Sequence, residues 1–221
     1  MLRGGDDLLR HIEAKLGIKT GESTPDGRIE TLKLLSRNPG HYDDAALAGI
    51  ERILTDAGAA DDAIEGVRIG TTIGTNALLE RTGAATVLVI TEGFADLLRI
   101  GTQQRPELFR PDVQRAAPLY DAVVEVSERL DSRGDVLRRL DASAVEPEAR
   151  VLIGRGIRTA AVALMHSYRN PAHELALRDL LLEWGFEHVS CSAALAPSIK
   201  LLPRAQTAVV DAYLAPVVRT Y

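Results

Sequence analysis

The sequence predicts an α/β protein with a largely parallel or mixed sheet and helices on both faces of that sheet. Two continuous apolar runs, at residues 85–90 and 159–165, are typical of strands that are covered on both sides. Helical patterns alternate with these runs along the chain, and such alternation indicates a parallel sheet. We therefore expect both runs in the main sheet, and a solvent-exposed face on either run would contradict the fold class.

Seven segments have apolar residues at helical spacing or residue types that start and end helices. They are residues 6–16, 43–57, 77–81, 93–100, 142–154, 171–184 and 206–221. The pair Asp43 and Asp44 suits the N-cap of the second helix, and Asp141 or Ser143 suits that of the fifth. Gly83 suits the C-terminal end of the third.

Four further segments are predicted to be strands of less apolar character. They are residues 29–35, 67–69, 122–129 and 188–192. Residues 122–129 alternate between apolar and polar side chains, which predicts a strand with one exposed face. A turn at Ser132 to Gly134 follows this strand.

Composition excludes several classes of protein. The 221 residues include 26 basic and 31 acidic side chains, so no excess of positive charge is present to neutralise nucleic-acid phosphates. A single cysteine, Cys191, excludes an internal disulfide framework and a zinc cluster built on several thiolates. Apolar runs are far shorter than a membrane span, and the first residues contain no apolar signal core. We expect a cytoplasmic protein.

The loop at residues 70–76 is the strongest local candidate for a binding site. Its sequence, with the preceding residue, is IGTTIGTN, and it follows a short predicted strand and precedes a helix. Glycines allow close backbone approach to an anion, and free N–H groups at a helix start attract negative charge. We assign Thr71, Thr72, Thr75 and Asn76 a role facing phosphate or substrate. The alternative is a strand–helix turn in which Thr75 or Asn76 only caps the helix.

The loop at residues 101–105 is the second candidate. Its sequence, GTQQR, places two amides and a guanidinium close together, and these groups can bind a carboxylate, amide or phosphate. We assign Gln103 and Arg105 to the substrate carboxylate or amide; the alternative is a solvated surface loop. Because both loops follow strand-like segments, we expect them to open at the same end of the sheet.

The segment HSYRNPAHE at residues 166–174 is the third candidate, because it directly follows the buried run at 159–165. His166 stands at the carboxyl end of that predicted strand and is a candidate orienting or acid/base group. His173 and Glu174 invite a metal site, but their spacing from His166 fits no established ligand pattern. A structural turn, in which Asn170 caps the next helix, is favoured over a metal site.

Three other reactive or charged side chains have structural alternatives. Cys191 lies among small residues beside a predicted strand, which favours a buried structural thiol. Lys200 and Arg204 can face an anion or can flank the last helix as solvated charges.

Several linked motifs together resemble the amino-terminal region of the hydantoinase A/5-oxoprolinase family. The segments that carry the resemblance are TLKLLSRNPGHYDDAALAGI at 31–50, RIGTTIGTNALLERTGAATVLVITEGFADLLRIGTQQRPELF at 68–109, VVEVSERLDSRGDVLRRLD at 123–141, ALMHSYRNPAHE at 163–174 and LLPRAQTAVVDAYLAPVVRTY at 201–221. They occur in order from about residue 26 onward. The strings NPGHYDDAA and IGTQQRP are most similar to those of 5-oxoprolinase.

This resemblance implies a fold of the actin-like, sugar-kinase type and ATP-dependent opening of a cyclic amide. In that chemistry ATP phosphorylates the amide oxygen of 5-oxoproline or a hydantoin, and the activated lactam is then hydrolysed. ATP and Mg²⁺ are the implied cofactors. Two alternatives stay open: a subunit of an ATP-dependent ketone carboxylase, and a non-catalytic binding or assembly module.

The chain departs from the family pattern at its beginning. Members of the family start with a strand and a glycine-rich phosphate turn, whereas residues 1–25 contain only MLRGGDD in that place. We expect this segment to pack poorly and residues 26–221 to form the family-type α/β domain. The second phosphate loop of the fold and a hydantoinase B-type region are also expected partners that the chain does not contain. The chain alone is therefore expected not to turn over ATP.

One kinetic prediction concerns Arg105. In an intact enzyme containing this region, Arg105→Ala should raise the KM for the lactam roughly tenfold or more, because lost charge-assisted hydrogen bonds contribute about 1.5–3 kcal/mol. Steady-state kinetics with varied lactam would measure the change, and unchanged kinetics would contradict the assignment.

Overall fold

The computed structural model describes residues 32, 34, 40–42, 44–58, 70–103 and 116–219. The chain forms two compact units, Met1–Ile69 and Gly70–Tyr221. Within the described residues, no helix has the length and apolar character needed to cross a bilayer. The expected helix at 6–16, the strand at 67–69 and the boundary near residue 25 lie outside the described residues.

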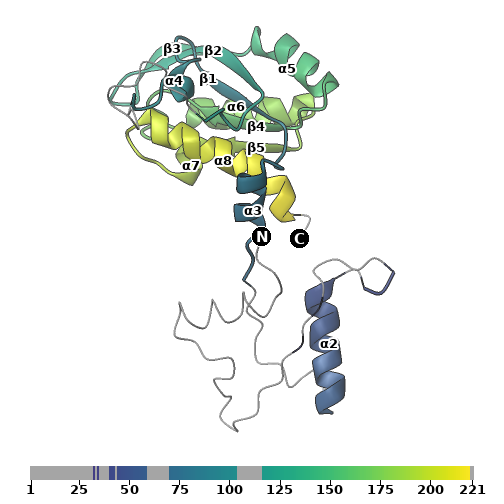
Figure 1. Cartoon of the computed structure of the whole chain (residues 1–221). Helices are drawn as coiled ribbons and strands as arrows, with labels where there is room; N and C mark the ends of the chain where they lie inside the picture. Colours follow the sequence, from purple (N-terminus) through teal and green to yellow (C-terminus); the bar gives the residue numbers. More distant parts are fainter. Residues whose placement is uncertain are drawn as a thin grey trace, which may run out of the picture. The chain divides into compact units, whose positions relative to one another are not determined.

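The first unit contains one described helix, α2 (Ala45–Ala57) (Figure 1). Asp44 is its N-cap, and the carboxylate accepts hydrogen bonds from the amides of Ala46 (2.7 Å) and Leu47 (3.0 Å), as the sequence predicted. Gly58 ends the helix in the left-handed conformation, with φ +63°. Leu32 and Leu34 are the described members of the expected strand at 29–35, and neither lies in a strand.

The second unit is built on a five-stranded sheet with the strand order β3-β2-β1-β4-β5. The strands are β1 (Thr86–Thr91), β2 (Ala122–Leu130), β3 (Val136–Asp141), β4 (Thr159–Ala163) and β5 (His188–Cys191). All neighbours are parallel except β2 and β3. Both predicted apolar runs are central strands, and every residue of β1 and β4 is buried. The predicted fold class is confirmed.

Strand β3 was missed by the sequence prediction. It pairs antiparallel with β2 after a tight turn in which Gly134 has φ +92°. Nearly all of its residues are exposed, because β3 is an edge strand that pairs with β2 alone among the described strands. Its sequence therefore lacks the alternation that identifies a half-buried strand. The adjacent β2 does alternate in burial from Val124 onward, as predicted for residues 122–129.

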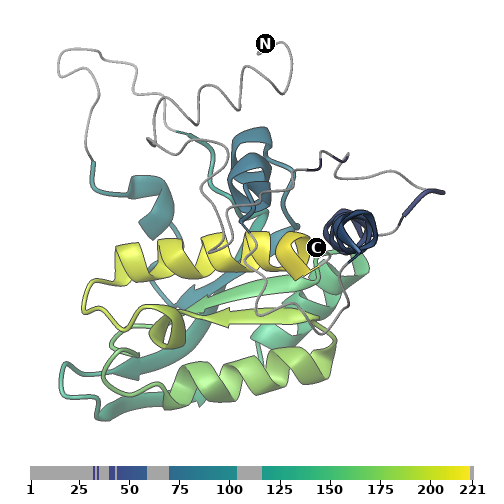
Figure 2. The same cartoon turned by 90° about the horizontal axis from the view of Figure 1, so that it is seen from below.

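Helices cover both faces of this sheet, so the second unit has three layers (Figure 2). The helices are α3 (Ile73–Glu80), α4 (Leu97–Ile100), α5 (Val145–Gly154), α6 (Ala172–Trp184), α7 (Ser192–Leu195) and α8 (Leu201–Arg219). Helices α5 and α6 pack on the face to which Val87 and Val89 of β1 belong. Helices α4 and α8 pack on the face of Leu88 and Ile90. This alternation along one strand explains the continuous apolar run.

Four helices begin three or more residues away from their predicted starts, among them α4, which begins at Leu97 rather than at residue 93. Helix α3 starts four residues earlier than expected, at Ile73. Helix α8 starts at Leu201, because a proline such as Pro203 is tolerated in the first turn of a helix. Helix α5 starts at Val145 without a side-chain cap. The Asp141 carboxylate instead accepts from the Ser143 amide (3.0 Å) and forms a turn ahead of the helix, so the predicted cap is wrong.

Helix α8 runs antiparallel to the central strands. Near its start, Arg204 donates to the carbonyl of Leu164, just beyond the carboxyl end of β4 (2.8 Å). Near its other end, the Tyr213 carbonyl accepts from the amide of Ala84, just before β1 (2.9 Å). Gly83 lies so close to the Tyr213 ring that a Cβ atom would overlap it. The start of α8 therefore lies at the carboxyl edge of the sheet, and the Tyr213 end of α8 lies at the amino edge.

Neighbouring leucines on α6 test the layered packing. Leu181 is fully buried in the core beneath the sheet, whereas Leu182 is 43% exposed. Leu181→Ala is expected to lower the free energy of unfolding by about 2–5 kcal/mol, because the deletion leaves a cavity. Leu182→Ala on the same helix serves as the matched control and should cost far less. Urea unfolding of both variants measures the difference, and equal losses would contradict the packing.

Candidate active site at the carboxyl edge of the sheet

The chain leaves the two central strands in opposite directions. After β1 it enters α4, whose Leu97 and Leu98 pack on the α8 face of the sheet. After β4 it enters α6, which packs on the opposite face. In open α/β sheets, ligands bind in the crevice outside the carboxyl ends of strands at such a reversal. The fold therefore predicts a ligand-binding site at the carboxyl ends of β1 and β4.

The turn that follows β4 carries His166 in an unusual backbone conformation. His166 has φ +58°, in the left-handed region that non-glycine residues rarely occupy. Its Nδ1 atom is buried and has no hydrogen-bond partner. A strained backbone and an unpaired buried nitrogen both cost free energy, and such costs concentrate at functional sites. His166 is therefore the strongest candidate for a catalytic or binding group among the described residues.

Glu174, in the first turn of α6, holds one side of this turn. It is fully buried and accepts hydrogen bonds from the Leu164 amide (2.9 Å) and the Ser167 hydroxyl (2.7 Å). It also forms an ion pair with Arg204 of α8 (3.3 Å). Burial lowers the pKa of Arg204, while the Glu174 carboxylate opposes that shift. Of the two alternatives for Arg204, the solvated surface charge is wrong, because its side chain is fully buried, and the anion that it faces is the Glu174 carboxylate.

The adjacent His173 holds the opposite side. Its Nδ1 atom lies 2.8 Å from a carboxylate oxygen of Glu128, a buried residue of β2. The Thr91 hydroxyl at the end of β1 donates to the same carboxylate. Thr91 Oγ1 in turn accepts from the Met165 amide (2.8 Å), the residue directly before His166. The ends of β1, β2 and β4 are thus joined by one buried polar chain.

A third contact comes from the hairpin between β2 and β3. The Asn170 side-chain amide donates to the Gly134 carbonyl (2.9 Å), and the Asn170 carbonyl oxygen Oδ1 accepts from the Ala172 amide (3.1 Å). Asn170 thus forms a turn directly before α6, whose N-cap is Pro171 without a side-chain capping hydrogen bond, so the predicted Asn170 cap is wrong. A Cβ atom on Gly134 would stand 3.2 Å from the side chains of Arg169 and Asn170, so the two turns pack closely.

Gln103 belongs to the same edge of the sheet. It stands after α4 on the connection that leaves the carboxyl end of β1, and its side chain is exposed. Its φ is +58°, so two of the three described non-glycine residues with positive φ, Gln103 and His166, are predicted site residues. The third is Arg81. Arg105 lies outside the described residues, and its role stays a prediction.

The residues of the first predicted loop lie at the other edge. Thr75 and Asn76 are in α3 rather than in a loop, and Thr71 and Thr72 precede that helix. A Cβ atom on Gly74 would stand 3.8 Å from Leu214, near the far end of α8 (Figure 1). The prediction that both loops open at one end of the sheet is therefore wrong. Helix α3 comes before β1 in the chain and therefore lies near the amino end of β1. Gln103 comes after β1 and therefore lies on the connection that starts at the carboxyl end.

The local bonding of α3 is simple. Thr72 makes no side-chain capping hydrogen bond, and the Thr71 hydroxyl oxygen accepts from the Ile73 amide (3.3 Å). The side chains of Thr75 and Asn76 are exposed. Their assignment to phosphate or substrate stays a prediction.

Cys191 is the structural thiol that the sequence favoured. It is 6% exposed, and its thiol donates to the Glu174 carbonyl (3.6 Å). Burial, followed by the nearby Glu174 carboxylate, raises the pKa of Cys191 to about 12. The thiolate that reacts as a nucleophile is therefore scarce at neutral pH.

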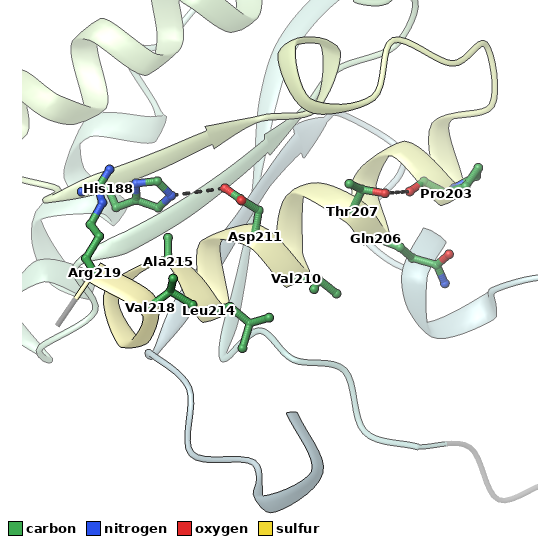
Figure 3. A pocket seen from close by; sticks show the side chains of 10 residues that line it. All are labelled: His188, Pro203, Gln206, Thr207, Val210, Asp211, Leu214, Ala215, Val218 and Arg219. Atoms are coloured by element: carbon green, nitrogen blue, oxygen red, sulfur yellow. Dashed lines mark hydrogen bonds and ion pairs between the residues drawn. The ribbon is translucent and has the colours of Figure 1, made fainter. Parts of the chain in front are cut away.

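A groove of about 850 Å³ follows the exposed face of α8 (Figure 3). At one end His188 Nε2 lies 3.0 Å from the Ser190 hydroxyl and 3.4 Å from an Asp211 carboxylate oxygen. These residue types form nucleophilic triads, but here the Ser190 hydroxyl donates to Asp211 (2.7 Å). A triad needs the imidazole between serine and carboxylate. The cluster instead ties the start of β5 to α8.

Metal-binding side chains are sparse in the described part of the chain. No group of three or more His, Cys, Asp or Glu side chains there is arranged to hold a metal ion. His173 is paired with Glu128.

The three-layer sheet has the fold of two solved ATP-dependent enzymes. Acetone carboxylase in its nucleotide-free structure aligns with a TM-score of 0.67 and 26% identity, over 79% of this chain and 27% of that chain. An ATP-dependent caprolactamase from Pseudomonas jessenii aligns with a TM-score of 0.68 and 26% identity, over 84% and 28%. The chain has this α/β, actin-like fold.

Residues 18–185 match the family described as the hydantoinase/oxoprolinase N-terminal region, and the chain belongs to this family. It is 42% identical to 5-oxoprolinase 1 of Arabidopsis thaliana over 89% of its length. It is 37% identical to 5-oxoprolinase of Saccharomyces cerevisiae over 92% of its length. In both alignments the chain spans 18% of the relative. The acetophenone carboxylase gamma subunit of Aromatoleum aromaticum is 37% identical over 68% of this chain.

The sequence did not reveal that Glu128, Glu174 and Arg204 are buried around the turn that carries His166. Glu128 lies in an alternating strand, where a charged residue is expected on the exposed face. Arg204 lies in a segment that contains prolines and a lysine, which is typical of a surface. The one signal in the sequence is the His173-Glu174 pair at a helix start, because two ionisable side chains there need partners in the fold.

A glycine substitution tests whether His166 is retained at a structural cost. His166→Gly is expected to keep the free energy of unfolding within about 1 kcal/mol of the wild type or to raise it, because glycine adopts positive φ without strain. Urea unfolding measures this value. Arg169→Gly, at a neighbouring exposed residue without positive φ, is the control and should lose about 0.4–1 kcal/mol. A larger loss for His166→Gly than for the control would contradict the strain.

Proposed function

We propose that this chain is the amino-terminal part of an ATP-dependent enzyme that opens a cyclic amide, with 5-oxoproline or a hydantoin as substrate. The observation that carries the proposal is His166, strained and with an unpaired nitrogen, at the carboxyl reversal point of a sheet of this family. The identity to two 5-oxoprolinases supports the substrate class. An ATP-dependent caprolactamase among the structural neighbours supports the reaction class.

The chemistry has a clear physical basis. A lactam carbonyl is stabilised by resonance and is a poor electrophile, and ATP supplies the phosphoryl group that makes its oxygen a leaving group. Water then adds to the activated carbon and the C–N bond breaks, leaving an acyl phosphate. A second water releases the phosphate. The balance is one lactam, one ATP and two waters to one amino acid, ADP and phosphate.

The residues of the chain have distinct proposed tasks. His166 orients the lactam or moves a proton at the ring nitrogen, which must gain one when the C–N bond breaks. Gln103 and Arg105 hold the substrate carboxylate or amide. Thr71, Thr72, Thr75 and Asn76 face phosphate or substrate on a separate surface at the amino edge. Together these tasks require a second surface that brings the two edges into one site.

That second surface is proposed to come from partners. The remainder of the hydantoinase A region and a hydantoinase B-type region or subunit would complete the nucleotide site, and the chain alone is not expected to turn over ATP. The described residues contain no group of three or more side chains that could hold a metal ion, so Mg²⁺ is assigned to the complete enzyme. Dependence on ATP favours the cytoplasm.

A subunit of an ATP-dependent ketone carboxylase is the second candidate. The acetone carboxylase and acetophenone carboxylase matches favour it. The two reactions differ in their second substrate, since carboxylation needs bicarbonate and lactam opening needs only water. A non-catalytic binding or assembly module is the third candidate and would show neither reaction.

A chimera tests these candidates. This chain replaces the matching segment of the Arabidopsis 5-oxoprolinase, and the product is assayed with ATP and 5-oxoproline for glutamate and phosphate. We expect ring opening, and we expect His166→Gln to lower kcat by about a hundredfold or more, since acid–base groups contribute 10²–10⁴-fold. Arg150→Gln, which removes only a surface ion pair with Glu146, is the control and should leave kcat unchanged.

Three results would contradict the proposal. Bicarbonate-dependent consumption of acetone or acetophenone without lactam opening would favour the carboxylase. A folded chimera without either activity would favour the assembly module. Full activity of His166→Gln would contradict the catalytic role proposed for His166.

A further inference from the structure

A fully buried ion pair lies against the turn that carries His166. Arg204 of α8 and Glu174 of α6 have no exposed surface, and Arg204 Nη1 stands 3.3 Å from Glu174 Oε1. The two helices lie on opposite faces of the sheet (Figure 2), and these two side chains meet at the carboxyl end of β4. The ion pair therefore links the two helical layers beside the turn that carries His166.

Arg204 uses all three of its nitrogens on groups of this edge. Nη2 donates to the Leu164 carbonyl (2.8 Å), and Nε donates to the Ser198 carbonyl (3.1 Å). Nη1 donates to the hydroxyl oxygens of Ser167 and Ser192. The planar guanidinium thus ties the β4–α6 turn to the segment that follows β5.

Glu174 completes the same network from the other helix. Besides Leu164 and Ser167, its carboxylate accepts from the Ser192 hydroxyl (2.5 Å) and the Ala193 amide (2.9 Å). Two of these donors are backbone amides, so the carboxylate positions main chain as well as side chains. The residues directly before and after His166 are both held, since the Met165 amide donates to Thr91 and the Ser167 hydroxyl to Glu174.

Stability alone does not account for this arrangement. Removing two charges from water costs several kcal/mol per ion, and well-packed apolar side chains of similar volume often stabilise a protein more. A left-handed residue such as His166 persists only where the surrounding structure over-determines it. Bonds to the carbonyl, amide and hydroxyl of Leu164 and Ser167 over-determine the backbone on both sides of His166.

We propose that Arg204 and Glu174 are positioning residues: through Leu164 and Ser167 they hold His166 in its left-handed conformation, with its imidazole directed for reaction. This inference rests on the proposed function, because it assigns the two residues a task in the same site. Neither residue touches the substrate.

A double-mutant cycle tests the assignment in the chimera. Arg204→Lys keeps the positive charge but loses the planar guanidinium with its several N–H donors. Glu174→Gln keeps the shape of the side chain but loses the negative charge. We expect each to lower kcat roughly tenfold to a hundredfold with little change in KM, because small misplacements of a catalytic group cost that much. In the His166→Gln background the same substitutions should change kcat by less than about twofold. Equal losses in both backgrounds would overturn the proposal.

Leu181→Ala is the matched control for loss of stability. It lies on α6 with Glu174 and is equally buried, but makes no contact with the turn in the described hydrogen-bond network. Rates are compared at a temperature where circular dichroism shows all variants folded. A loss of kcat in Leu181→Ala equal to that in Arg204→Lys would overturn the proposal, since any loosening of the core would then suffice.

A second measurement is independent of activity. The ring carbon–proton NMR signals of the 221-residue chain are recorded, and that of His166 is assigned by its loss in His166→Gln. We expect one sharp His166 signal in the wild type and in Leu181→Ala, and a broadened or multiple signal in Arg204→Lys and Glu174→Gln. An unchanged signal in both variants overturns the proposal. Altered signals together with full activity of His166→Gln overturn the proposed function instead.

Discussion

Complete burial of β1 and β4 is the constraint on which the rest of the second unit depends. Both strands have apolar side chains on two faces, so helices must cover each face. In this chain the connections after β1 and β4 leave toward opposite faces, to α4 and to α6, and α8 and α5 complete the two helical layers. The connections therefore diverge between the carboxyl ends of β1 and β4. Such a reversal point leaves a crevice in which a ligand can bind.

The polar groups at that edge follow from the same constraint. Where the central strands end, their last backbone groups leave the ladder but remain buried, and each needs a partner. Glu174 and Arg204 serve the carboxyl end of β4, while Thr91 and Glu128 link it to β1 and β2. Charged side chains inside a protein are costly, so their concentration around one turn distinguishes this edge from the amino edge.

The separation of the two predicted loops bears on how a complete enzyme works. The residues around α3 and those around His166 lie at opposite edges of one sheet, so one rigid layer cannot bring the two sets of candidate residues side by side. The chain spans about a fifth of the 5-oxoprolinases that it matches. In the proposed enzyme the additional chain supplies the surface against which these edges act.

Much of the candidate site was visible in the sequence. His166 and Gln103 stand directly after apolar segments, and both have the backbone strain that functional residues often show. Asp44 was recognised as a cap because capping depends on backbone amides only two or three positions away. Edge strand β3 was not recognised, since its pairing partner, rather than its own pattern, makes it a strand. The start of α5 was misplaced for a related reason: a local turn competes with the helix for the Asp141 carboxylate.

The sequence by itself determined the α/β class, the two central strands and the family, because burial on two faces leaves continuous apolar runs and family motifs are local strings. Only the tertiary structure decided that Arg204 is buried, that Glu174 and His173 hold opposite sides of one turn, and that α3 lies at the amino edge. Each of these facts depends on residues from distant segments. The free energy of a buried charge is set by the groups that surround it in space, and no local pattern encodes those neighbours.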